Sequence, residues 1–168
     1  MPALAKTHPA DIDVAALTAD ALVNVTAWAL WDSRTGQPAP GSRVVEAKRI
    51  LDDALATPAG REHPGILHLY LHTMEMSTTP QEALPAADLL RDLVPDAGHL
   101  RHMPSHIDVL CGNYRDSVVA NLAAVQADQR FVEREGPLTF YSPYPAHNLH
   151  SVVCSASFDG ISARPSGA

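Results

Sequence analysis

Apolar residues along most of the chain recur every three or four positions, which is the period of an α-helix with one buried face. The period holds in every long segment, so we expect an all-α fold without a sheet. The apolar stripe of the first segment includes Trp28. The pattern predicts about seven helices, at roughly 13–31, 43–57, 64–77, 80–94, 104–111, 114–135 and 147–158.

Residues that typically start or stop helices support these boundaries. Ser42 is suited to cap the second helix, and Pro58 is placed to stop it. His63 followed by Pro64 has the form of a cap with proline in the first turn. Pro85 lies close enough to the start of the fourth helix to tighten or kink it.

Histidines recur along the chain at a fixed spacing. His68 and His102 are 34 residues apart, and His72 and His106 are also 34 apart. This is the period of the helix-turn-helix hairpins of tetratricopeptide (TPR) repeats. The histidines should therefore occupy equivalent positions in adjacent hairpins.

Small residues show the same spacing, because Ala83 recurs 34 residues later as Ser117. Small side chains at these positions allow two helices to cross closely. We therefore expect a TPR-like array of antiparallel helix hairpins with a right-handed superhelical twist. The array should occupy residues 13–159, after an N-terminal arm (1–12) and before a flexible tail (160–168).

The composition excludes several classes of protein. The chain has 168 residues, 46% of them apolar, which suits one domain with a modest core. Its formal net charge is -7, and it lacks the clustered Lys and Arg that neutralise nucleic-acid phosphates. No apolar run approaches the roughly 20 residues that a membrane span needs. With two cysteines and no secretory signal pattern, we expect a cytoplasmic protein.

Two of the histidine pairs have helical spacing. Residues four apart lie on the same face of a helix, so His68 with His72, and His102 with His106, can each direct two imidazoles at one ion. In the first helix of a TPR-type hairpin this face generally lines the concave groove. The two pairs should therefore converge across adjacent hairpins.

A carboxylate and a third histidine pair accompany them. Glu75 follows on the stripe that carries His72, and His147 and His150 form a pair at spacing three. Six imidazoles would suffice for two metal ions with three ligands each. They would also suffice for one ion whose ligands are contacted by the remaining histidines. The expected ligands are His68, His72, His102, His106, His147 and His150.

Three short motifs extend this picture: His-Pro-Gly at 63–65, His-Met-Pro-Ser-His-Ile at 102–107 and His-Asn-Leu-His at 147–150. In these motifs the chain resembles a group of bacterial TPR proteins, over roughly residues 15–160. The resemblance implies the fold, and it implies that this chain is a short or truncated version. It also implies a shared placement of His63, His68, His72, Glu75, His99, His102, His106, His147 and His150.

The ligand types narrow the choice of metal. Imidazole suits copper, zinc, iron and nickel, whereas a site with Glu75 as its one evident carboxylate disfavours magnesium and calcium. A helical di-iron site would usually draw on several Glu residues with Glu-x-x-His spacing, which is missing here. Paired histidines on antiparallel helices resemble coupled dicopper sites. We therefore expect copper first, with iron or zinc as alternatives.

These features favour a metal-dependent enzyme that oxidises a small organic substrate with dioxygen. Glu75 would act as a general base or orient a ligand, and Tyr141 or Tyr144 would lie beside an open coordination position. Two alternatives remain. One is an adaptor whose histidine-lined groove binds a peptide from a partner protein, and the other is a zinc-dependent hydrolase with Glu75 as its base.

Other residues near the clusters are expected to support the site or the core. His63 is either a helix cap or a residue behind the ligands, and His99 would orient a ligand imidazole. Cys154 is either a core residue or a further metal-site residue. The methionines expected to fill gaps in the core are Met74, Met76 and Met103.

The last predicted helix, 147–158, has no successor to cover its outer face. Stacked repeats normally end in a polar capping element, which the tail after Gly160 does not supply. We therefore expect a homo-oligomer or a partner chain to bury this face.

Overall fold

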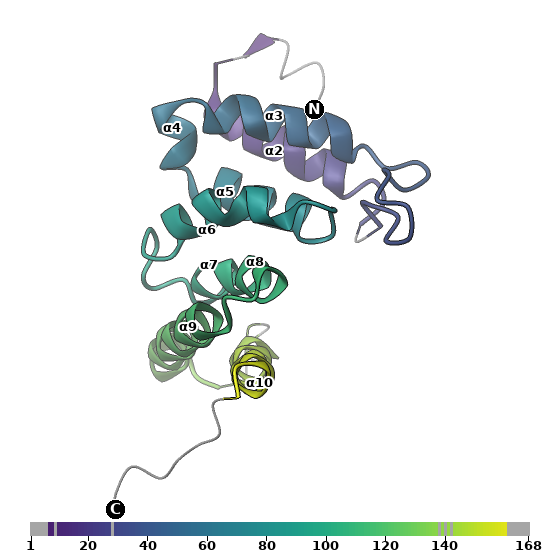
Figure 1. The fold of residues 1–168 in the computed structure, drawn as a ribbon. Coiled ribbons are helices and arrows are strands. Elements are labelled where there is room, and N and C mark those ends of the chain that lie inside the picture. The colour runs from purple at the N-terminus through teal and green to yellow at the C-terminus, as the bar shows by residue number, and fades with distance from the viewer. Residues whose placement is uncertain are drawn as a thin grey trace, which may run out of the picture.

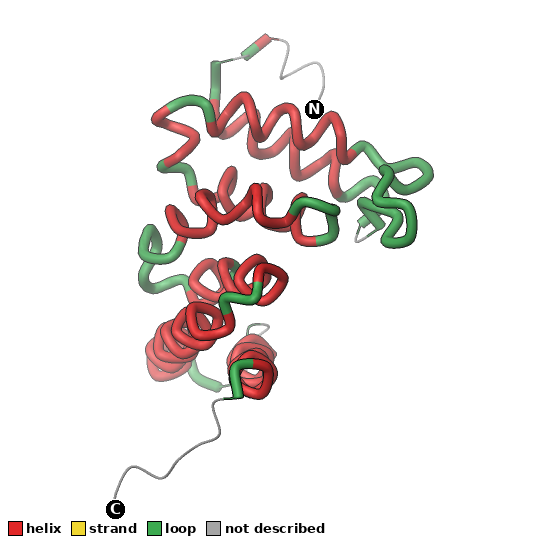
Figure 2. Tube along the Cα trace, in the orientation of Figure 1, coloured by secondary structure: helices red, strands yellow, loops and turns green. Residues whose placement is uncertain are grey.

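The computed structural model describes residues 7, 8, 10–27, 29–137, 139, 141 and 143–160. Among these residues every regular element is a helix, and the one β contact is an isolated antiparallel bridge between Trp31 and Pro38. Figure 2 shows the described chain as helices joined by loops. The all-α prediction is therefore confirmed. Trp28, placed above in the first helix, and residues 161–168 of the predicted tail lie outside the described residues.

The helices are stacked in layers along the molecule (Figure 1). Helix α2 packs on α3, α5 on α6, and α9 on both α8 and α10, while contacts from α3 to α5 and from α6 to α8 join the layers. This is the expected array of helix hairpins, whereas the TPR assignment stays a prediction. None of the described helices is both long and apolar enough to cross a bilayer. The elements are α2 (Ile12–Val23), α3 (Val44–Leu55), α4 (Pro58–Arg61), α5 (Pro64–Glu75), η1 (Pro80–Ala83), α6 (Leu84–Leu90), α7 (Gly98–His102), α8 (Pro104–Cys111), α9 (Tyr114–Glu135) and α10 (Pro143–Phe158).

The first helix is shorter than predicted, because α2 ends at Val23 and not near Trp31. At its end the Asn24 side chain donates to the backbone carbonyl of Asp20 at 2.9 Å. Trp31 lies in the loop that follows. Its indole N–H donates to the carbonyl of Thr73 at 2.7 Å, so the loop is tied to α5 instead of extending α2.

Prolines decide where two other helices begin. The predicted fourth helix is a 3-10 turn followed by α6, which has Pro85 in its first turn and ends at Leu90. The last helix starts at Pro143, earlier than the predicted His147. Pro143 and Pro145 are tolerated there because backbone N–H groups in the first turn have no partner within the helix.

The core runs through the stacked layers. Met74 and Met103 are buried in it as predicted, but Met76 is 43% exposed, so its assignment to the core was wrong. Met76 follows the last residue of α5 and leaves the buried face there. Ala83 and Ser117, the small residues in repeat register, are fully buried. The fully buried aliphatic residues include Val44, Leu51, Ile66, Leu67, Leu71, Leu90 and Ile107.

Helix α10 carries exposed apolar side chains, and the partly exposed ring of Phe158 stacks on Tyr114 of α9 at 5.5 Å between centroids. Leu149, Val153 and Phe158 each expose half or more of their surface. These side chains agree with an uncovered last helix. The homo-oligomer or partner chain that would bury them stays a prediction.

One buried ion pair joins α6 to α8. The Asp108 carboxylate is fully buried and accepts two hydrogen bonds from the Arg91 guanidinium, at 2.6 and 2.8 Å. Parallel bonds of this kind fix both distance and orientation. The pair therefore sets the position of α8, which carries one of the histidines of the candidate site described below.

We predict that Arg91→Met destabilises the protein by about 2–4 kcal/mol, because it leaves the buried Asp108 charge without a partner. The value lies below that of a fully buried pair because the Arg91 side chain is 25% exposed. Urea unfolding followed by circular dichroism measures the change. Arg134→Met, at a side chain that is 71% exposed, is the control and should shift stability by less than about 0.5 kcal/mol. Equal effects of the two variants would contradict the prediction.

Candidate metal centre

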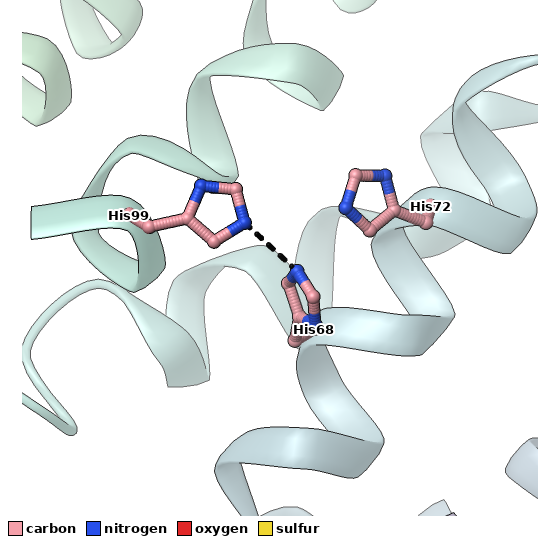
Figure 3. Close-up of side chains that lie close together, drawn as sticks. All are labelled: His68, His72 and His99. Atoms are coloured by element: carbon pink, nitrogen blue, oxygen red, sulfur yellow. Dashed lines mark hydrogen bonds between the residues drawn. The ribbon is translucent and has the colours of Figure 1, made fainter. Parts of the chain in front are cut away.

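Three histidines from two helices meet at one point, and we call this group triad A. His68 and His72 lie one turn apart on α5, and His99 reaches them from α7 (Figure 3). The Nε2 atoms of His68 and His99 are 3.1 Å apart. One ring nitrogen from each of the three lies within 4.8 Å of the other two. Three imidazole nitrogens at this spacing could hold a metal ion.

A second group, triad B, combines His102 of α7, His106 of α8 and His147 of α10. The Nε2 atom of His102 is 2.8 Å from that of His106 and 3.1 Å from that of His147. Ring nitrogens of all three lie within 4.8 Å of one another, so triad B could also hold a metal ion. The two triads are adjacent, because the ring centroids of His99 and His102 are 6.2 Å apart.

The junction between α7 and α8 keeps two ligands of triad B aligned. Pro104 opens α8 and has no N–H to continue the helical hydrogen bonds of α7. Met103, just before it, nevertheless has helical angles, with φ −51° and ψ −41°. The chain therefore keeps its direction through the break, and His102 and His106, four residues apart, lie on one face.

Glu75 connects the two triads. Its Oε1 atom is 2.9 Å from Nδ1 of His72, and its Oε2 atom is 2.6 Å from Nδ1 of His106. Burial alone would raise the pKa of Glu75, but the hydrogen bonds to His106 and His72 outweigh this effect and lower the pKa to about 2. The carboxylate is thus charged and accepts from both Nδ1 atoms. It orients the two rings and directs the Nε2 atom of His106 into triad B.

An amide orients the central ring of triad B. Nδ1 of His102 is 2.6 Å from Oδ1 of Asn121, and the Asn121 amide nitrogen donates to the carbonyl of Ser117 at 2.9 Å. Because the amide nitrogen is occupied in this way, Oδ1 faces the ring and accepts the Nδ1 proton. The lone pair of His102 is therefore on Nε2.

A buried carboxylate, that of Asp128, helps to position the helices that carry both triads. Asp128 accepts from the Tyr141 hydroxyl at 2.8 Å and from the Asn148 amide at 2.7 Å. The Tyr141 oxygen in turn accepts from the backbone N–H of His99 at 3.0 Å. A Cβ atom on Gly98 would lie 1.8 Å from Oδ1 of Asp128, so this close approach requires glycine. Asp128 thereby ties the start of α7 and the first turns of α10 to α9.

Sequence reasoning did not identify Asn121, Asp128 or Asn148. A signal was present for the first two. They are seven residues apart on α9, and Ala124 lies between them on the same buried face. Polar residues within a buried helical stripe usually hold hydrogen-bond partners.

Burial keeps several of the rings neutral. Loss of solvation, together with the charges of His72 and His99, lowers the pKa of His68 to about 3. Loss of solvation also lowers the pKa of His99 to about 4, and that of His102 to about 3, with a further contribution from the charge of His106. At neutral pH these three rings are therefore uncharged, which is the form that binds a metal.

The remaining predicted site residues lie around the triads. His99, expected behind a ligand, is a member of triad A, whereas His150 is in neither triad found among the described residues. Nε2 of His150 lies 3.5 Å from Sγ of Cys154, and both side chains are exposed, so Cys154 is not a core residue. The ring of Tyr144 is 5.3 Å from that of His99.

His63 lies away from the triads and caps α5. The helix cap is one of the two roles expected for it. Its Nδ1 atom accepts from the backbone N–H of Ile66 at 3.1 Å, and its Nε2 atom is 3.0 Å from the Asp13 carboxylate. Both ring nitrogens are thus occupied outside the metal centre. The role behind the ligands is not supported by these contacts.

Comparison with protein-family models, curated proteins and solved structures finds no match for the chain. The resemblance to bacterial TPR proteins therefore stays a prediction.

We predict that Asp128→Ala weakens zinc binding by about tenfold to 100-fold, because the groups that position His99 and α10 lose their shared acceptor. Competition with a zinc chelator measures the affinity, and circular dichroism verifies that the helices persist. Glu133→Ala, at an exposed position on the same helix, is the matched control and should bind zinc as the unmodified chain does. Equal zinc affinity in both variants would show that Asp128 does not position the ligands.

Proposed function

We propose that the chain is a dinuclear copper enzyme that oxidises a small organic substrate with dioxygen. Each triad would hold one copper ion through three imidazoles. Triad A would use His68, His72 and His99, and triad B would use His102, His106 and His147. Compared with the sequence prediction, His99 replaces His150 in the ligand set.

The observation that carries the proposal is the contact between His102 and His106. Each Nδ1 faces an acceptor, Oδ1 of Asn121 in one case and Glu75 in the other, so both Nε2 atoms present lone pairs. These two atoms are 2.8 Å apart. Two lone pairs at this distance repel unless a cation lies between or beside them. A metal ion beside both Nε2 atoms would accept the two lone pairs at once, which supports the proposal.

The donor set supports copper over the harder metals. The proposed ligands are imidazole nitrogens. Both oxygens of the nearby Glu75 carboxylate are hydrogen bonded to Nδ1 atoms, one of His72 and one of His106. Iron and manganese in helical sites usually take several carboxylate ligands, whereas copper and zinc accept imidazole alone. Three protein ligands leave a coordination position for dioxygen or substrate.

The spacing of the triads supports a two-electron reaction. Their rings approach to 6.0 Å between the centroids of His72 and His106, so the two ions would be neighbours. Each copper ion exchanges one electron between its two common oxidation states. Together they would pass two electrons from the substrate to dioxygen. The substrate loses two electrons and two protons, and dioxygen gains both to form hydrogen peroxide.

Zinc hydrolysis is supported less well than copper oxidation. A zinc hydrolase needs a general base that accepts a proton from bound water. Glu75 is the nearest carboxylate, but its low pKa and its two histidine partners make it a weak base. The adaptor alternative gives no account of the opposed lone pairs in triad B.

We predict that protein purified without a polyhistidine tag binds about two equivalents of copper, in line with three ligands per ion. His68→Ala and His106→Ala should each reduce this content to about one equivalent or less, because each removes a ligand. His150→Ala is the control and should retain about two. Atomic absorption measures copper, with circular dichroism for helicity. Less than about 0.2 equivalents in the unmodified chain, or full content in all variants, would overturn the proposal.

We predict a different result for Glu75→Gln. The substitution keeps the shape, but its amide nitrogen cannot accept from an Nδ1–H, so one of the two rings loses its orientation. Copper content should fall little, while oxygen uptake with ascorbate as the reductant should fall roughly tenfold or more. Glu82→Gln, whose side chain is 50% exposed, is the control. Uptake equal to that of Glu82→Gln would contradict the role assigned to Glu75.

A further inference from the structure

A cavity of about 430 Å³ opens beside triad B. His102, His106 and His147 all line it, whereas no histidine of triad A does. A molecule bound there would therefore reach an ion at triad B and would be separated from an ion at triad A. The two triads are thus unequal in their access to a ligand of this size.

The walls of the cavity have two kinds of surface. Met76, Val109 and Leu110 form an apolar part, and Leu110 is 52% exposed at its edge. Small hydroxyl side chains form a second part: Ser105, Ser117, Ser151 and Ser155. Such walls suit a molecule with an apolar body and a group that can donate a hydrogen bond.

Hydroxyl groups in the cavity wall already donate their protons to other groups, but their oxygens can still accept a hydrogen bond. The oxygens of Ser117 and Ser155 are 2.7 Å apart, and the Ser151 hydroxyl donates to the carbonyl of His147 at 3.0 Å. A hydroxyl oxygen has two acceptor lone pairs, so each oxygen that donates elsewhere can still accept. Ser117 and Ser155 are fully buried, whereas Ser151 is half-buried, so a substrate hydroxyl would find its acceptor at Ser151.

The charges around the cavity argue against an anionic substrate body. Neither Lys nor Arg is among the described residues that line it. The Glu75 carboxylate in its wall is occupied by His72 and His106, and Nε2 of His150 faces Cys154. An anionic group placed away from the metal ion would lose its hydration without gaining a cationic partner, which is costly.

We propose that this cavity is the substrate site and that it takes a small, uncharged alcohol, such as an aromatic alcohol, whose hydroxyl is directed at the ion of triad B. The inference rests on the proposed function, because it assumes a metal ion at that triad. In the reaction the alcohol carbon loses hydrogen and becomes a carbonyl carbon. The two electrons and two protons that the alcohol loses pass to dioxygen, which becomes hydrogen peroxide.

Three probes that share a benzene ring test this assignment on the zinc-loaded protein, in which no redox reaction interferes. Benzyl alcohol should bind at least about threefold to tenfold more tightly than toluene, which lacks the hydroxyl. It should also bind about tenfold more tightly than 4-(hydroxymethyl)benzenesulfonate, whose charge would enter the apolar part. A sulfonate is used because it is a poor metal ligand. Ligand-observed nuclear magnetic resonance titrations give the three affinities.

A variant places a cation in the apolar wall. Leu110→Lys should raise the affinity for the sulfonate about threefold to fivefold, as expected for a partly exposed ion pair. Leu89→Lys, at a position that is 44% exposed on α6 and outside the cavity lining, is the control and should leave it unchanged. Normal zinc loading with equal affinities for the three probes, or equal effects of the two lysines, overturns the alcohol site alone. Failure to load zinc overturns the metal centre as well.

Discussion

The candidate metal centre depends on two imidazole lone pairs that the fold holds against each other. Glu75 and Asn121 accept the Nδ1 protons of His106 and His102, so the Nε2 atoms must face one another as acceptors at 2.8 Å. If either ring turned away it would lose its hydrogen bond, which for His102 is buried and for His106 is partly buried. A metal ion would remove this conflict because it would accept both lone pairs at once.

The rest of the fold serves this arrangement. Triad A comes from α5 and α7, and triad B from α7, α8 and α10, so every layer from α5 onward supplies a candidate ligand. Glu75 joins the triads, and Asp128 holds α7 and α10 to α9 through Tyr141 and Asn148. Side chains that are fixed by a second set of hydrogen bonds keep ligands in place before the metal arrives. The hairpin array thus provides a rigid frame for two neighbouring sites.

Local sequence patterns were sufficient for the fold and for part of the centre. The helical period gave the all-α array, and spacings of four correctly paired His68 with His72 and His102 with His106. The replacement of His150 by His99 in the ligand set could not be predicted. It depends on where α7 starts and on how α10 packs against α9. Those features are set by long-range contacts, such as Tyr141 with the His99 backbone. Asn121 and Asp128 were recognisable only as polar residues on a buried stripe of α9.

The most direct test of the central claim is anomalous X-ray diffraction at the copper absorption edge, on crystals of the copper-loaded protein. The account predicts two anomalous peaks per chain. One should lie among the ring nitrogens of His68, His72 and His99, and the other among those of His102, His106 and His147, with copper to nitrogen distances of about 2.0–2.1 Å, as for comparable imidazole-bound ions. No peak at the triads, or copper bound elsewhere, would contradict the account.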